Sequence, residues 1–147
     1  MARNVKAAQK PPYVGAILRM SVATVRGRLL AALSRHGYKD ISASQLTAFS
    51  YPFPDGLKPT ELAARANQSK QALNYMLTDL EAGGYVIRKA ERRGGRRRVY
   101  LSAKGKKVVE ICQNEMLTLQ HEWSKAVGKE RFETFLDVLK SMPGGWQ

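Results

Sequence analysis

The sequence has very little of three things: among its 147 residues it contains one cysteine, two histidines and no long apolar run. A single cysteine cannot form an internal disulfide, which is typical of a reducing compartment and leads us to expect a cytoplasmic protein. No stretch approaches the roughly 18–20 apolar residues that a membrane span needs. The polar segment from Met1 to Pro12 also lacks the apolar core of a signal peptide, so we expect no membrane partner.

Motifs of the common enzyme classes are absent as well. There is no Gly-rich phosphate loop, no Ser/His/Asp set with interpretable spacing and no pair of acids in a plausible pocket. His36 and His121 are far apart and have no nearby cysteine or carboxylate cluster, so their spacing predicts no zinc site. A favourable interaction with a helix C-terminus explains His36 better. We therefore expect a protein that is not an enzyme and that needs no metal or other cofactor.

Acidic residues are scarce relative to basic ones. Asp and Glu total 12 against 25 Lys and Arg, which gives a formal net charge of +13. Hydrophobic residues make up 44% of the chain, enough to bury a core, so the composition excludes global disorder. The length predicts one domain. A small, strongly basic domain most often binds nucleic acid, with an anionic membrane surface as the weaker alternative.

Most of the excess positive charge lies in residues 88–107, which contain ten basic residues and a single acid, Glu91. The basic residues are Arg88, Lys89, Arg92, Arg93, Arg96, Arg97, Arg98, Lys104, Lys106 and Lys107. Gly94-Gly95 is a turn signal with strand-like residues on both sides, at 85–87 and 99–101. The pattern predicts a β-hairpin with arginines at its tip, whose mutual repulsion a polyanion would relieve. A solvated charged surface without a partner is the alternative.

Apolar residues recur at helical spacing near both ends of the chain. The first stripe predicts a helix from about Val14 to His36, closed by Gly37, and consists of Val14, Leu18, Val22, Val25, Leu29 and Leu33. Arginines occupy the opposite face, at Arg19, Arg26, Arg28 and Arg35. The second stripe predicts a long helix capped by Ser102 and ended by Gly128, and consists of Val108, Cys112, Met116, Leu119, Trp123 and Val127.

A last helix is predicted through Phe132, Phe135, Leu136 and Leu139, ended by Pro143. Together the terminal stripes exceed what the middle of the chain can cover, which favours two subunits that share them over helices that pack only on each other. Cys112 lies within its stripe, so we expect a buried core thiol rather than a redox switch.

The middle of the chain is predicted to form three short helices and the hairpin. A short helix at 42–49 and a loop at 51–56 come first. Pro59 then opens a helix that ends near Asn67, and Ser69 caps another that stops at Gly83-Gly84. Two short helices with a tight connection, followed by a hairpin, predict a winged helix-turn-helix.

In such a motif the second helix enters the major groove of DNA and the hairpin follows the backbone or minor groove. The apolar positions of that helix are Leu73, Met76, Leu77 and Leu80, which leaves an outward face of Lys70, Gln71, Asn74, Tyr75 and Thr78. Gln and Asn suit adenine and Lys suits guanine. We expect Thr60 and Ser69, near helix starts, to bind phosphates. On the wing we expect phosphate and minor-groove contacts from Arg92, Arg93, Arg96 and Arg97, while Arg98 can face either way.

Several of these segments, taken in order, resemble the MarR family of bacterial winged helix-turn-helix regulators. They are residues 59–63, 68–73, 80–86 and 99–105, with Gln45 upstream and Glu122-Trp123 and 132–139 downstream, so that the resemblance covers about 14–142. The sequence departs from the family at Lys58, where Thr or Ser is usual, and at Gly94-Gly95, where an Asp usually stands beside the tip arginine.

The resemblance implies an α+β, mostly helical fold in which a winged helix-turn-helix core is flanked by long N- and C-terminal dimerisation helices. We expect a flexible basic arm at 1–12 and a single domain at 13–147, with the winged lobe at about 42–102 and dimerisation helices at about 13–37 and 103–142. The family also implies a small-molecule pocket between the dimer helices and the lobe. Its candidate lining residues are Tyr13, Arg19, Phe49, Tyr51 and Trp123.

The expected function is sequence-specific binding of double-stranded DNA by a homodimeric transcriptional regulator. We expect a repressor on a pseudo-palindromic operator, relieved by a small-molecule effector. Two alternatives stay open: a basic winged-helix module that binds RNA or DNA without strong sequence preference, and an interaction module that docks acidic proteins.

Overall fold

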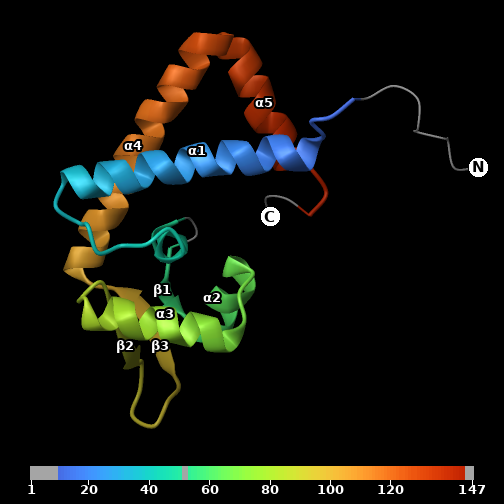
Figure 1. The fold of residues 1–147 in the computed structure, drawn as a ribbon. Coiled ribbons are helices and arrows are strands. Elements are labelled where there is room, and N and C mark those ends of the chain that lie inside the picture. The colour runs from blue at the N-terminus through green and yellow to red at the C-terminus, as the bar shows by residue number, and fades with distance from the viewer. Residues whose placement is uncertain (1–9, 51–52, 145–147) are drawn as a thin grey trace, which may run out of the picture.

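The computed structural model of the chain describes residues 10–50 and 53–144. The elements in order are α1 (Val14–Arg35), the 3-10 helix η1 (Gln45–Phe49), β1 (Asp55–Leu57), α2 (Pro59–Ala66), α3 (Lys70–Ala82), β2 (Val86–Ala90), β3 (Arg97–Leu101), α4 (Ala103–Val127) and α5 (Lys129–Ser141). In Figure 1, α2, α3 and the strands form a lobe at one end of α4, while α1 crosses α4 and α5 folds back from its far end. The fold is α+β and mostly helical, with a winged helix-turn-helix core between long helices at both ends, as predicted.

A three-stranded antiparallel sheet in the order β1-β3-β2 forms the wing and its base. The hairpin pairs Val86 with Leu101 and Ala90 with Arg97, so both strands are longer than the predicted apolar segments. The predicted loop at 51–56 is wrong at Asp55 and Gly56, which belong to strand β1 beside β3. Pro and Gly favour a loop locally, but pairing with a distant strand overrides that preference.

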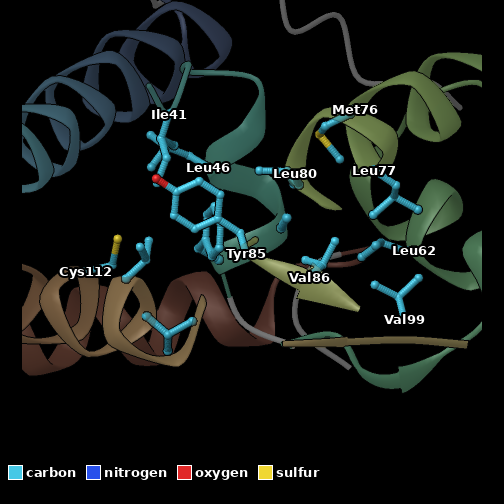
Figure 2. Close-up of a cluster of buried hydrophobic side chains, with 14 of the residues drawn as sticks. Ile41, Leu46, Leu62, Met76, Leu77, Leu80, Tyr85, Val86, Val99 and Cys112 are labelled. Carbon is cyan, nitrogen blue, oxygen red and sulfur yellow. The ribbon is translucent and has the colours of Figure 1, made fainter. Parts of the chain in front are cut away.

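One apolar core joins the lobe to the two crossing helices. Figure 2 shows Tyr85 in the middle of this core, between side chains from the lobe and Cys112 of α4. The Tyr85 ring meets Phe49 edge-on at a centroid distance of 5.8 Å. Its hydroxyl donates to the Asp40 carboxylate at 2.6 Å. Burial and this carboxylate raise the pKa of Tyr85, so the phenol stays protonated and keeps donating.

The first turn of α4 packs closely against the backbone at Tyr85. Ser102 caps the helix as predicted, since its Oγ accepts from the Gly105 N–H at 3.0 Å. A Cβ at position 105 would collide with the carbonyl oxygen of Tyr85, so this position needs glycine. The first turn of α4 is therefore held against the start of β2.

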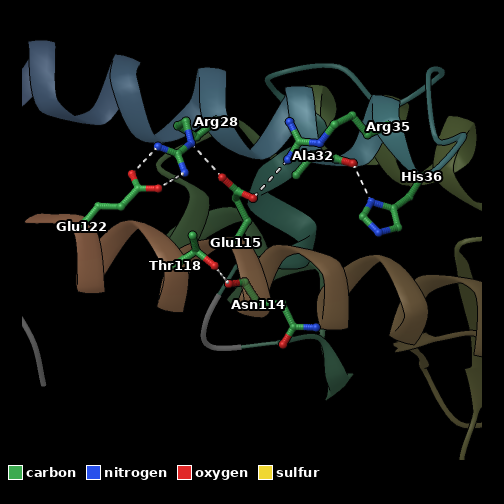
Figure 3. A network of polar contacts seen from close by, with 8 residues as sticks. All are labelled: Arg28, Ala32, Arg35, His36, Asn114, Glu115, Thr118 and Glu122. Carbon is green, nitrogen blue, oxygen red and sulfur yellow. Dashed lines mark hydrogen bonds and ion pairs between the residues drawn. The ribbon is translucent and has the colours of Figure 1, made fainter.

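Charged side chains join α1 to α4 where they cross, as Figure 3 shows. Arg28 donates from Nε to Glu115 and from Nη1 to Glu122, both at 2.7 Å. Arg35 adds a bond of 3.2 Å to Glu115. Part of the arginine face predicted opposite the apolar stripe therefore lies on α4.

The apolar stripe of α1 is only half buried by this crossing. Leu29 and Leu33 belong to the core, whereas Val14, Leu18 and Val22 are exposed. The helix predicted at 42–49 is a shorter 3-10 helix, η1. Of the predicted basic arm at 1–12, residues 1–9 lie outside the described part of the chain.

Candidate nucleic-acid interface

The helix-turn-helix is built from local signals that the sequence carries. α2 begins at Pro59 after Lys58, whose backbone N–H donates to the Glu61 carboxylate at 2.9 Å. Asn67 then turns the chain with φ of 50°, a left-handed conformation that Asn tolerates. Ser69 caps α3 by accepting from the Ala72 N–H at 3.1 Å. The connection between the two helices is therefore short and fixed at both ends.

α3 presents one apolar and one polar face. The four residues predicted as its core side, Leu73, Met76, Leu77 and Leu80, are all buried. The opposite side chains line one hollow of about 390 Å³ and are Lys70, Gln71, Asn74, Tyr75 and Thr78. All of them are exposed, and Tyr75 is 68% accessible despite its large ring. A polar helix face with an exposed aromatic ring suits the donors, acceptors and methyl groups of a DNA groove.

The two residues expected to bind phosphates lie at helix starts. Thr60 is exposed in the first turn of α2. Ser69 is exposed as well. Its Oγ accepts the capping hydrogen bond of α3, and its hydroxyl proton remains available for donation to a phosphate.

The four arginines expected to contact DNA lie around the turn of the hairpin. Gly94 adopts a φ of 78°, and the Gly95 N–H closes the turn on the Arg92 carbonyl at 2.9 Å. The side chains of Arg92, Arg93, Arg96 and Arg97 are exposed and have no hydrogen-bond or ion-pair partner within the described residues. A cluster of unpaired guanidinium groups on one turn is a strong attractor for a polyanion.

Other basic residues of the same run form contacts with other parts of the chain. Arg98 donates from Nη1 to the Gly56 carbonyl at 2.8 Å and its Nε lies 3.5 Å from Glu91, so it holds β1 to the sheet. Lys104 donates to the Gly83 carbonyl and lies 4.2 Å from the Tyr85 ring centroid. Arg88 pairs with Glu81 of α3. Sequence reasoning missed these roles, because a charge run does not reveal which members find internal partners.

Of the five residues expected to line a ligand pocket, the four that the structure describes are not brought together. Phe49 is almost fully buried and lines a cavity of about 600 Å³ between α1, η1 and α4. Trp123 lines a separate groove at the elbow of α4 and α5. Tyr13, directly before α1, and Arg19 of α1 are both exposed, and Tyr51 lies outside the described residues.

The cavity beside Phe49 is mostly apolar, with its walls formed by Val25, Leu29, Phe49, Ser50, Phe53, Cys112, Gln113, Asn114, Met116 and Leu117. A neighbouring cleft of about 300 Å³ shares three of these residues. Two arginines, Arg26 of α1 and Arg65 of α2, line that cleft. The two spaces together therefore offer an apolar wall and a cationic one.

Cys112 is a core residue and His36 is a helix-end residue. Cys112 is buried as expected, and burial raises the pKa of its thiol to about 11, which keeps it protonated near neutral pH. His36 follows the last turn of α1, with Nδ1 2.8 Å from the Ala32 carbonyl oxygen. Residues 10–50 and 53–144 contain no group of three or more His, Cys, Asp or Glu that could hold a metal. None of the helices in these ranges has the length and apolarity to cross a membrane.

Comparison with known proteins places this fold. Residues 51–97, which carry β1, the helix-turn-helix and the hairpin into its second strand, match the MarR family. No curated protein matches the chain. The MarR-family protein Rv2887 of Mycobacterium tuberculosis, solved with salicylic acid, is 25% identical, with 93% of this chain and 100% of that one covered at a TM-score of 0.66.

Two further structures extend the agreement at lower identity. MarR of E. coli in its oxidized form is 23% identical, with 89% of this chain and 94% of that one covered at a TM-score of 0.70. A MarR-family regulator of Rhodococcus sp. RHA1 is 16% identical over 87% of this chain and 91% of its own, at a TM-score of 0.64. The winged lobe therefore matches the MarR family in sequence, and most of the chain shares the winged helix-turn-helix fold of MarR-family structures.

Proposed function

We propose that the chain acts as a homodimeric repressor that binds a pseudo-palindromic DNA operator with sequence specificity. The observation that carries this proposal is the pairing of two surfaces in one lobe. The exposed polar face of α3, around Gln71 and Asn74, supplies groups that distinguish bases. The unpaired arginines at the hairpin tip supply charge for phosphates and a narrow minor groove.

Exposed apolar side chains support the dimer. On α1 they are Val14, Ile17, Leu18, Met20 and Val22, and on α4 and α5 they are Leu117, Val127, Phe135 and Val138. Large apolar side chains left uncovered at this many positions favour an interface with a second copy. A two-fold dimer that shares it would carry two α3 helices and two wings, and half-sites about one helical turn apart follow from that geometry. Bound across a promoter, such a dimer would exclude polymerase.

Selection of DNA from a random library by the purified full chain tests the proposal directly. We expect enrichment of an inverted repeat, a footprint over both half-sites and at least about a thousandfold preference over shuffled DNA. A preference near unity would instead support the general RNA- or DNA-binding module. Failure to protect any DNA, together with binding to acidic proteins, would support the docking module.

Substitutions on the two surfaces should have different signatures. Loss of Arg96 and Arg97 should weaken binding to all sequences alike and reduce the dependence of log K on log salt by about 0.9 per lost phosphate contact. Asn74→Ala should relax the base preference with little change in salt dependence. Mobility shifts over a salt series measure both, and binding that stays flat from low to high salt contradicts the proposal.

For the effector we propose a small amphipathic anion bound between α1, η1 and α4. Its apolar part would fill the cavity beside Phe49, and its anionic group would face Arg26 and Arg65, which have no other side-chain partner within the described residues. The chain of M. tuberculosis solved with salicylic acid supports this chemistry by analogy. A ligand there relieves repression only if it binds the DNA-free arrangement of lobe and helices more tightly.

Salicylate is the probe that tests this part. We expect it to raise the thermal midpoint of the free protein and to weaken operator binding, with both effects reduced in Arg65→Gln. The same substitution at Arg131, which lies in the separate groove at the α4–α5 elbow, is the matched control and should change neither effect.

A further inference from the structure

Arg88 is the basic residue of the wing that points toward α3. Its Nε donates to Glu81 Oε2 at 2.8 Å, and its Nη2 lies 2.7 Å from the same oxygen. Nη2 also donates to Thr78 Oγ1 at 3.3 Å, and the Arg88 backbone N–H reaches Glu81 Oε1 at 3.4 Å. The hydrogen bond from Arg88 holds the pKa of Glu81 below its ordinary value, so the carboxylate stays charged as pH falls toward the acid range.

This contact joins the two surfaces proposed to touch DNA. Thr78 belongs to the exposed face of α3, and its hydroxyl donates to the Asn74 carbonyl at 2.9 Å. Arg88 lies opposite Val99 in the hairpin ladder, on the strand that runs out to the arginine tip. Over the described ranges, every side-chain hydrogen bond between α3 and the hairpin comes from Arg88. Beyond Val99 β1 no longer pairs with β3, so the outer part of the hairpin is two-stranded, and a bond from its base to α3 helps to hold one orientation.

We propose that Arg88 and Glu81 are positioning residues that fix the wing relative to α3, so that the tip arginines and the base-reading face engage one half-site together. The proposal rests on the proposed DNA-binding function. A wing held in its bound orientation loses less conformational freedom on binding than a freely hinged one, which favours the complex. Arg88 therefore contributes to specificity without touching a base or a phosphate.

For Glu81→Gln, simple charge counting and the positioning role predict opposite changes in DNA affinity. Glu81→Gln removes an acid from a DNA-binding lobe, so electrostatics alone predicts tighter binding to any DNA. The positioning role predicts about tenfold weaker binding to the selected operator and no loss on shuffled DNA, because only the specific complex needs both surfaces in register. Asp79→Asn is the matched control, since Asp79 is an exposed acid of α3 whose carboxylate has no partner within the described residues.

The experiment compares the full-length wild type, Glu81→Gln, Arg88→Lys and Asp79→Asn by fluorescence anisotropy on operator and shuffled DNA over a salt series. Arg88→Lys keeps the charge but loses the forked contact, so we expect it to behave like Glu81→Gln. In a background where Arg92, Arg93, Arg96 and Arg97 are all alanine, Glu81→Gln should have no further effect, because no tip contact is left to position. A merely destabilising change would still act in that background.

A measurement without DNA separates this proposal from the proposed function. Hydrogen exchange of the β2 and β3 amides should be faster in Glu81→Gln than in Asp79→Asn, while exchange in α4 is the same in both. Operator binding by Glu81→Gln as tight as that of Asp79→Asn, or unchanged hairpin exchange, overturns the positioning role. If the wild type selects no DNA, the proposed function fails, and with it the role on DNA. The exchange data then still report whether Arg88 holds the hairpin.

Discussion

The winged lobe and the helical region bury their apolar side chains to very different degrees. In the lobe, Leu73, Leu77 and Val99 are each 0% exposed. In the helical region, Val14 is 70% exposed and Val138 is 44% exposed. The lobe has a complete core within one chain, whereas the helices carry apolar surface that this chain leaves uncovered.

The two regions also differ in what holds them. Side chains from several elements interlock around Tyr85 in the core, which Figure 2 shows. The crossing of α1 and α4 relies in addition on Arg28, Arg35, Glu115 and Glu122, most of which are partly accessible to solvent (Figure 3). Apolar contacts carry no charge to be screened or titrated, whereas exposed ion pairs are screened by both solvent and salt. The lobe is therefore suited to hold a fixed shape, and the helical region to respond to a partner and to conditions.

Shortening a buried side chain in the core of the lobe should have the largest effect on stability. Leu77→Ala is expected to lower the free energy of unfolding by about 3–4 kcal/mol, because it removes buried contacts and leaves a cavity. Chemical denaturation measures the change. Ile87→Ala, on the exposed side of β2, is the control and should cost under about 1 kcal/mol. Equal costs at the two positions would break the contrast between core and surface in the lobe.

The second largest effect is expected from a charge placed within the exposed apolar stripe of α1. Leu18→Glu is expected to weaken self-association about a hundredfold while the lobe stays folded, since it would bury a charge against a second copy. Sedimentation over a concentration series gives the dissociation constant, and circular dichroism checks the fold. Ala31→Glu adds the same charge at an exposed position of α1 away from the stripe and should not change association. A wild-type protein that stays monomeric would contradict the proposal that two subunits share these helices.

Sequence reasoning succeeded where the signal is local. Ser69 and Ser102 cap their helices as expected, because a cap depends on residues three positions apart. It failed for β1, whose partner Tyr100 lies far along the chain and whose Gly56 carbonyl is held by Arg98. It also treated Arg88 as one more free charge, since nothing short of the folded hairpin brings that guanidinium to Glu81. Phe49 shows a third limit: composition does not tell a core ring from a cavity wall, and this residue is both.

The seam between the two regions should respond to a smaller change. Tyr85→Phe removes the hydroxyl that donates to Asp40, and we expect a loss of about 1 kcal/mol in the free energy of unfolding. Tyr38→Phe is the control, because its ring also packs near Tyr85 but its hydroxyl has no hydrogen-bond partner within the described residues. Similar losses in both variants would mean that the Asp40 contact does not join the α1–η1 connection to the lobe.

Loss of the Glu122 ion pair on acidification should produce the smallest effect. The hydrogen bond from Arg28 lowers the pKa of Glu122 below its ordinary value in the folded state. A group whose folded pKa is depressed stabilises the protein above its unfolded pKa, about 4.3 for Glu, and this stabilisation is lost as pH falls through the lowered value. The thermal midpoint of Glu122→Gln should therefore fall less on acidification than that of the wild type.

Glu110→Gln makes the same chemical change on an exposed part of α4 where the carboxylate has no partner within the described residues, and its midpoint should follow the wild type at every pH. Added salt should narrow the difference between wild type and Glu122→Gln, because half of the Glu122 side chain is open to solvent. A difference that persists in high salt would assign the crossing to apolar packing, and the contrast between the two regions would then rest on exposed surface alone.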